Sequence, residues 1–92
     1  MIVRIATEGQ YEVADADMPA LNEFDDAAVQ ACEGSDEAGF RAAFEQLLAL
    51  VREKGRRLDE DALVGSDLIL PPPDVSLAEA RAEFRGEGLI PG

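Results

Sequence analysis

The first hydrophobic positions of the chain alternate with polar ones, which is the period of a strand with one buried face. Two short alternating runs lie on either side of Gly9 and predict a β-hairpin over residues 2–14. The side chains expected on its buried face are Val3, Ile5, Tyr11 and Val13. Because a two-stranded hairpin is only marginally stable alone, this face must pack against the rest of the chain.

The register of this hairpin is predicted from which residues face each other. Opposed residues in an antiparallel pair point to the same face of the sheet. The expected pairs are Ile5 with Tyr11, Val3 with Val13 and, on the outer face, Arg4 with Glu12. This register leaves a three-residue loop of Thr7, Glu8 and Gly9, with Gly9 in the left-handed conformation that such loops require.

A first helix is predicted from a helical period of apolar residues after the hairpin. It should begin near Pro19, with Asp17 or Met18 as its cap, and end at Gly34. The residues expected to face inward are Leu21, Phe24, Ala28 and Cys32, with Val29 and Ala31 beside them.

A second helix carries the clearest helical period in the chain. Ser35 or Asp36 can cap it, and Gly55 should end it. Its inward residues are expected to be Phe40, Phe44, Leu47, Leu48 and Val51, with Ala43 and Leu50 at the edges. Glu37 and Arg41 are spaced to pair on its outer side. The short connection between the two helices predicts an antiparallel helix pair.

The last third of the chain is punctuated by prolines. Residues 56–65 are predicted to be an acidic connector, with a helical turn over residues 60–63. Residues 67–70 form a short extended segment, the only candidate for a third strand, and three prolines follow it. Ser76 and Glu79 have the spacing of a capping box. They predict a C-terminal helix that ends at Phe84 or Arg85, before Gly86, with Leu77, Ala80 and Phe84 facing inward.

These elements predict a single α+β domain over residues 1–92. An N-terminal β-hairpin, which the short third strand can join, packs on an antiparallel helix pair, and a C-terminal helix completes the domain. A chain of 92 residues is long enough for one modest hydrophobic core and no more.

The composition indicates which kinds of partner and which cellular compartment to expect. Twenty acidic residues against eight basic ones give a net charge of −12, which opposes binding to nucleic acid and to anionic lipid headgroups. One cysteine cannot form an internal disulfide, and no apolar run approaches the ~20 residues of a membrane-spanning helix. We therefore expect a cytoplasmic protein that does not insert into a membrane by itself.

Candidate catalytic and metal-binding residues are few. Cys32 lies on the apolar stripe of the first helix in a chain without histidine, so we expect a core residue. The acidic groups Asp25-Asp26 and Asp59-Glu60-Asp61 are expected to be solvated, which does not favour acid–base catalysis. Asp15, Asp17 and Asp26 match part of a calcium loop, but Ala20 stands where that loop needs glycine. The sequence predicts no cofactor and no metal site.

Half of all the basic residues lie close together: Arg52, Lys54, Arg56 and Arg57. They can complement the dipole at the C-terminus of the second helix. The alternative is a docking patch for an acidic partner.

Partner binding is predicted for apolar residues on backbone that prolines stiffen, because a preorganised segment loses less entropy on binding. The predicted residues are Leu68, Ile69, Leu70, Pro71, Pro72, Pro73, Leu89, Ile90 and Pro91. The alternative for residues 68–70, and for Leu89 and Ile90, is that they complete the core.

Several short motifs, taken in order along the chain, resemble those of a known family. They are Met1-Ile2-Val3-Arg4-Ile5 with Glu8-Gly9-Gln10-Tyr11, Phe40-Arg41 with Leu47-Leu48-Ala49-Leu50-Val51-Arg52, Ser66-Asp67-Leu68-Ile69-Leu70-Pro71-Pro72, and Gly88-Leu89-Ile90-Pro91-Gly92. In this combination the chain resembles the PspA-associated small domain family, which is encoded beside phage shock protein A. The resemblance covers almost the whole chain.

This resemblance implies a non-enzymatic protein–protein interaction module of the phage-shock envelope-stress response. The implied partner is phage shock protein A, a coiled-coil membrane-stress protein, which would bring the chain to the inner face of the membrane. The resemblance implies no catalytic or ligand-binding residues. Two other function classes remain open: a small acidic regulator or inhibitor of another cytoplasmic protein, and a subunit of an enzyme.

Overall fold

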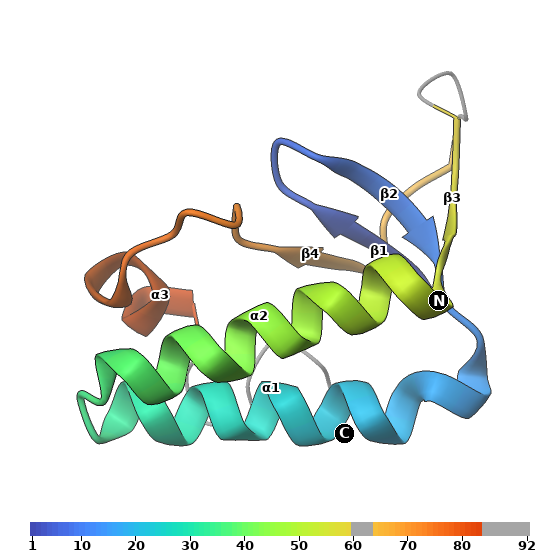
Figure 1. Cartoon of the computed structure of the whole chain (residues 1–92). Coiled ribbons are helices and arrows are strands. Elements are labelled where there is room, and N and C mark those ends of the chain that lie inside the picture. The colour runs from blue at the N-terminus through green and yellow to red at the C-terminus, as the bar shows by residue number, and fades with distance from the viewer. Residues whose placement is uncertain (60–63, 84–92) are drawn as a thin grey trace.

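The structure, a computed structural model, describes residues 1–59 and 64–83. In chain order, the elements are β1 (Ile2–Ile5), β2 (Gly9–Glu12), a 3₁₀ turn η1 (Asp15–Asp17), α1 (Met18–Glu33), α2 (Glu37–Lys54), β3 (Arg56–Arg57), β4 (Leu68–Leu70) and α3 (Leu77–Glu83). The sheet lies over the C-terminal half of α2, α1 runs along the other side of α2, and α3 contacts α1 (Figure 1). The predicted α+β fold is confirmed.

The sheet has four strands in the order β3-β2-β1-β4. The hairpin β1–β2 is antiparallel, as predicted, and the short apolar segment joins it as β4, parallel to β1. The sequence did not predict β3, in which two arginines pair with Tyr11 and Glu12 of β2. β3 and β4 therefore lie on opposite edges of the sheet (Figure 1).

The predicted hairpin register is wrong by two residues. Val3 lies opposite Tyr11, and Ile5 lies opposite Gly9. A shift of two residues leaves every side chain on the same face, so hydrophobic alternation could not distinguish the two registers. The predicted buried face is nevertheless correct. All four apolar side chains expected there are buried: Val3, Ile5, Tyr11 and Val13.

Backbone bonds at both ends of the hairpin fix the observed register. At the turn, the Glu8 N–H donates to the Ile5 carbonyl at 2.9 Å, and Thr7 takes a left-handed φ of 69°. At the other end, the Val13 N–H donates to the carbonyl of Met1 at 2.8 Å. The loop is therefore residues 6–8, and Gly9, with a φ of 147°, begins β2 instead of lying in the loop.

The antiparallel helix pair forms as predicted and provides most of the core. The Asp36 carboxylate caps α2 by accepting from the Gly39 N–H at 3.0 Å, whereas Asp17 makes no such bond at the start of α1. The rings of Phe40 and Phe44 stack with centroids 5.5 Å apart. The inward residues predicted for α2 are buried, apart from the edge residue Leu50, and on α1 only Phe24 remains partly exposed.

The C-terminal helix has the predicted capping box. The Ser76 hydroxyl accepts from the Glu79 N–H at 3.1 Å, and the Glu79 carboxylate accepts from that hydroxyl at 2.9 Å. Ala80 is fully buried and Leu77 partly buried. The predicted helix end at Phe84 or Arg85, the stop at Gly86 and the turn over residues 60–63 lie outside the described residues.

Candidate functional site

The predicted partner-binding segment around β4 divides into a buried and an exposed part. Leu68, Leu70 and Pro71 are buried, so the core interpretation is confirmed for the two leucines. Ile69 points the other way and is 60% exposed, a large value for an isoleucine in a strand. Pro72 and Pro73 are half-buried. The other predicted residues, Leu89, Ile90 and Pro91, lie outside the described residues.

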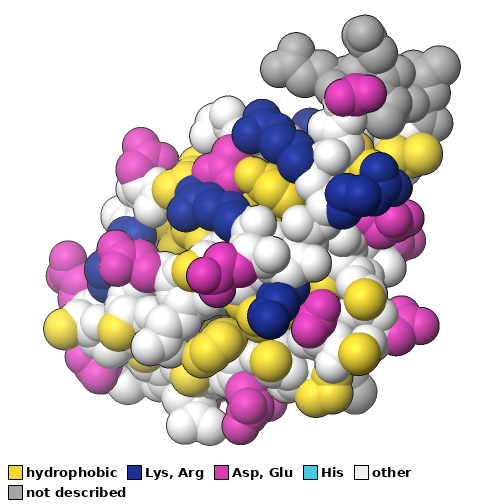
Figure 2. Space-filling model, turned by 45° about the vertical axis from the view of Figure 1, so that its right-hand side comes forward, with side chains coloured by type: hydrophobic (Ala, Val, Ile, Leu, Met, Phe, Trp, Pro, Cys, Tyr) yellow, Lys and Arg dark blue, Asp and Glu magenta, His cyan; other side chains and the backbone are white. Residues whose placement is uncertain are grey.

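The cluster of basic residues is used largely to hold the hairpin. Arg52 pairs with Glu8 on the hairpin turn, and Arg56 pairs with Glu12 at 3.0 Å. Lys54 lies in the last turn of α2, where it complements the helix dipole, and makes no ion pair within the described part of the chain. Figure 2 shows one face of the molecule, on which basic side chains are scattered among acidic and hydrophobic ones.

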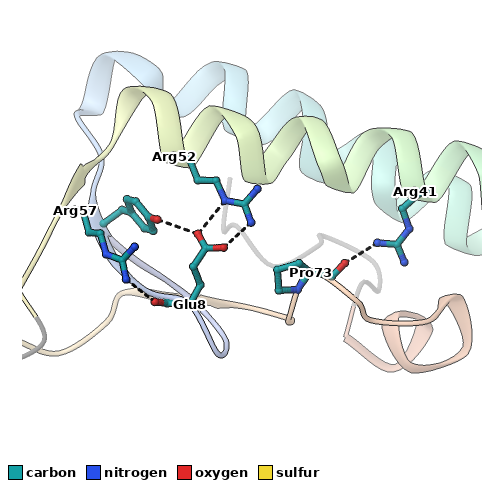
Figure 3. Close-up of polar contacts among 6 residues, drawn as sticks. Glu8, Arg41, Arg52, Arg57 and Pro73 are labelled. Carbon is teal, nitrogen blue, oxygen red and sulfur yellow. Dashed lines mark hydrogen bonds and ion pairs between the residues drawn. The ribbon is translucent and has the colours of Figure 1, made fainter.

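Glu8 is the centre of this polar network (Figure 3). Its carboxylate accepts from Arg52 Nε at 2.9 Å and from the Tyr11 hydroxyl at 2.9 Å, while Arg57 Nη2 donates to its backbone carbonyl at 2.9 Å. The Arg52 hydrogen bond lowers the pKa of Glu8 below its usual 4.5. Burial, reinforced by Glu8, raises the pKa of Tyr11. The network therefore ties the hairpin turn to the end of α2.

A second polar contact holds the proline segment in place (Figure 3). Arg41 of α2 donates through Nη1 to the carbonyl of Pro73 at 2.8 Å and through Nη2 to the carbonyl of Val75 at 2.5 Å. Arg41 therefore makes a different contact from the expected pair with Glu37. Its planar guanidinium donates two N–H groups to the two backbone carbonyls, which together form a bidentate site. Arg41 thereby fixes the path of the chain between β4 and α3.

Of the candidate catalytic residues, Cys32 and Asp25 are buried, whereas Asp26 and Asp59 are exposed. Cys32 is 2% exposed, as expected of a core residue, and burial raises the pKa of its thiol. Asp25 contradicts the expectation of a solvated carboxylate, because it is fully buried in α1. Asp26 and Asp59 are exposed, and Glu60 and Asp61 lie outside the described residues.

Residues 1–59 and 64–83 contain no group of three or more acidic or cysteine side chains that could hold a metal ion. In the same part of the chain, no helix is long and apolar enough to cross a membrane.

A comparison with protein families decides what the chain is related to. A family model described as PspA-Associated protein matches residues 1–92. The chain belongs to the PspA-associated protein family. Neither the comparison with curated proteins nor that with solved structures gave a significant match.

In this PspA-associated protein, Gln10 has a role that its sequence position did not predict. This residue is 7% exposed, and its side-chain Nε2 donates to the Val64 carbonyl at 3.1 Å and to the Ser66 hydroxyl at 2.8 Å. These bonds hold residues 64–66 over the sheet on their way to β4. A glutamine at an outward position of a strand is expected to face solvent. Only its contacts with residues distant in the sequence show that it is buried.

Proposed function

We propose that this PspA-associated protein is a non-enzymatic interaction module that acts with phage shock protein A in the envelope-stress response. The observation that carries the proposal is the family match over the whole chain. The burial of the single cysteine supports a role without thiol chemistry, because the reactive form of cysteine is the exposed thiolate. The protein works in the cytoplasm and reaches the inner face of the membrane through its partner.

The partner binds at the surface around β4 and the proline segment. Ile69 presents an exposed apolar side chain on an edge strand, next to backbone that Arg41 and the prolines hold in one conformation. Such preorganisation lowers the entropy lost on association, so that an apolar contact contributes more net affinity. Leu89, Ile90 and Pro91 are part of the same proposed interface.

The test is direct binding of the purified chain to purified phage shock protein A, followed by biolayer interferometry. Ile69→Glu places a charge on the proposed interface at an exposed position, so we expect the fold to survive and the affinity to fall about tenfold or more. Ala49→Glu adds the same charge on an exposed position of α2 and is the matched control. The proposed surface is wrong if both variants bind like the wild type. The proposed partner is wrong if the wild-type protein does not bind at all.

A truncation after Gly88 tests the contribution of the last residues separately. Weaker binding with an intact melting transition places Leu89–Pro91 in the interface. Loss of folding assigns them to the core, and unchanged binding by a folded protein removes them from the proposed interface.

A further inference from the structure

Strand β4 forms one edge of the sheet (Figure 1). Within residues 1–59 and 64–83, β1 is the only strand that pairs with it. The Ala6 N–H donates to the Leu70 carbonyl at 3.0 Å, so the main-chain groups of Leu70 point toward β1. Successive residues of a strand direct their N–H and C=O groups to opposite edges. The N–H and C=O of Ile69 therefore point away from β1, toward the outer edge.

These two main-chain groups of Ile69 are open to a partner. Ile69 makes no hydrogen bond across the outer edge to any residue that the structure describes. The residue is 60% exposed, so the edge is accessible at this position. An edge strand with open N–H and C=O groups is a template on which a further strand can pair.

The strand that offers these groups is fixed before any partner binds. The Asp67 N–H donates to the Ile2 carbonyl at 2.8 Å, and the Ile2 N–H donates to Asp67 Oδ2 at 2.8 Å. The side chains of Leu68 and Leu70 are buried in the core. An added strand would therefore bind an edge that is already ordered, which lowers the entropy lost on association.

The prolines that follow β4 limit the length of an added strand. Residues 71–73 are all proline and have no N–H to donate. Since the groups of Leu70 point toward β1, Ile69 is the one residue among positions 69–73 that offers both a donor and an acceptor at the outer edge. The edge therefore suits a short segment centred on Ile69, and it does not support an open-ended ladder.

The chemistry of this edge selects an extended segment as its occupant. The N–H and C=O groups inside a helix already bond to each other, whereas an extended segment presents both to a neighbouring strand. The Ile69 side chain lies on the face of the sheet away from the helices, because its neighbours Leu68 and Leu70 are buried. The residue opposite Ile69 in an added strand would share that face, where a β-branched or aromatic side chain packs well. A second copy of the chain is a poorer occupant, since two chains with a net charge of −12 repel each other.

We propose that an extended segment of the protein partner pairs with the outer edge of β4. It exchanges main-chain hydrogen bonds with Ile69 and places a β-branched or aromatic side chain beside it. The proposal rests on the proposed function and deepens it, because it states how the partner contacts the surface around β4. In phage shock protein A the segment lies outside the coiled-coil helices, whose main-chain groups are already bonded.

The first experiment follows hydrogen exchange of single amides by NMR, in the free protein and in its complex with purified phage shock protein A. The Ile69 N–H should exchange fast in the free protein, and the complex should slow it about tenfold or more. The Ala6 N–H, which already donates to the Leu70 carbonyl, is the internal control and should change less. Slow exchange of Ile69 in the free protein, or a complex that leaves its fast exchange unchanged, overturns the proposal. A wild-type protein that does not bind at all rejects the proposed partner instead.

The second experiment removes the outward donor and keeps an apolar side chain. Ile69→Pro leaves the bonds between β4 and β1 intact, because proline is tolerated in an edge strand where the N–H faces outward. We expect about a tenfold loss of affinity for phage shock protein A, since a main-chain hydrogen bond is lost. Ile69→Val keeps the N–H and a β-branched side chain, and it should change the affinity less than about threefold. Equal affinities of the two folded variants overturn the proposal, and if Ile69→Pro does not fold, the exchange measurement decides.

A third measurement separates the edge from the identity of the partner. The peptide acetyl-Lys-Val-Ile-Val-Lys-amide is titrated into the isotope-labelled protein and followed by NMR. The control is the same peptide N-methylated at every residue, which carries the same charge but cannot donate main-chain hydrogen bonds. A shift of the Ile69 amide signal with the unmethylated peptide alone supports strand addition even if phage shock protein A does not bind. Equal shifts with both peptides, or none with either, reject it.

Discussion

Removal of the Arg41 side chain should detach the proline segment from α2. In the folded protein its guanidinium donates to the carbonyls of Pro73 and Val75, at 2.8 and 2.5 Å. A hydrogen bond to a charged group contributes about 1.5–3 kcal/mol, but Arg41 is only half-buried and its partners can regain water. We therefore expect Arg41→Ala to lower the free energy of unfolding by about 2 kcal/mol in total.

The direction of this change is informative because helix propensity acts the other way. Alanine is the best helix former, so the substitution should slightly stabilise α2 itself. Arg41→Lys retains the charge but cannot form the bidentate contact, and its loss should be about half as large. Gln46→Ala, at an exposed position of the same helix, is the control and should change stability by less than about 0.5 kcal/mol.

Urea denaturation followed by circular dichroism measures the total loss, and hydrogen exchange shows where it occurs. The Val75 N–H donates to the Pro72 carbonyl, so it should exchange faster in Arg41→Ala while core amides of α2 change less. If Arg41→Ala unfolds at the same urea concentration as the wild type and Val75 exchanges at the same rate, Arg41 does not hold this segment and the reasoning is refuted.

Four further predictions concern the core, the hairpin, pH and the thiol. Phe44→Ala should cost about 3–5 kcal/mol in urea denaturation, because the ring is fully buried; a loss below about 1 kcal/mol would contradict its place in the core. Gly9→Ala should cost about 1 kcal/mol or more, since its φ is positive and a Cβ would press on the Arg57 side chain; an unchanged melting temperature would disprove this. Glu8 has a lowered pKa in the folded protein, so its stabilising contribution is present above its usual pKa and is lost as the pH falls through the folded value. Glu8→Gln should therefore lower the free energy of unfolding at neutral pH and make it depend less on pH on the acid side. Stability profiles of wild type and variant that run parallel over this pH range would contradict the prediction. Cys32 should resist a maleimide reagent in the native protein and react after denaturation, and rapid native labelling would show that it is accessible.

Elements with local signals could be predicted from the sequence alone. The helical period of α2 identified its buried stripe, including Phe40 and Val51, because the pattern and the core face share one period. The spacing of Ser76 and Glu79 predicted the start of α3, since a capping box involves only residues close together in the chain. Alternation identified the faces of the hairpin for the same reason.

Which distant segments meet depends on the packing of the whole chain and could not be predicted from local patterns. The hairpin register depends on backbone bonds at the turn and between Met1 and Val13, and two registers fit the same alternation. Arg57 lies in a strand because its backbone pairs with the free edge of β2. The hydrogen bond from Gln10 to Ser66 joins residues 56 positions apart. Such contacts are set by the packing of the whole chain, and no local pattern encodes them.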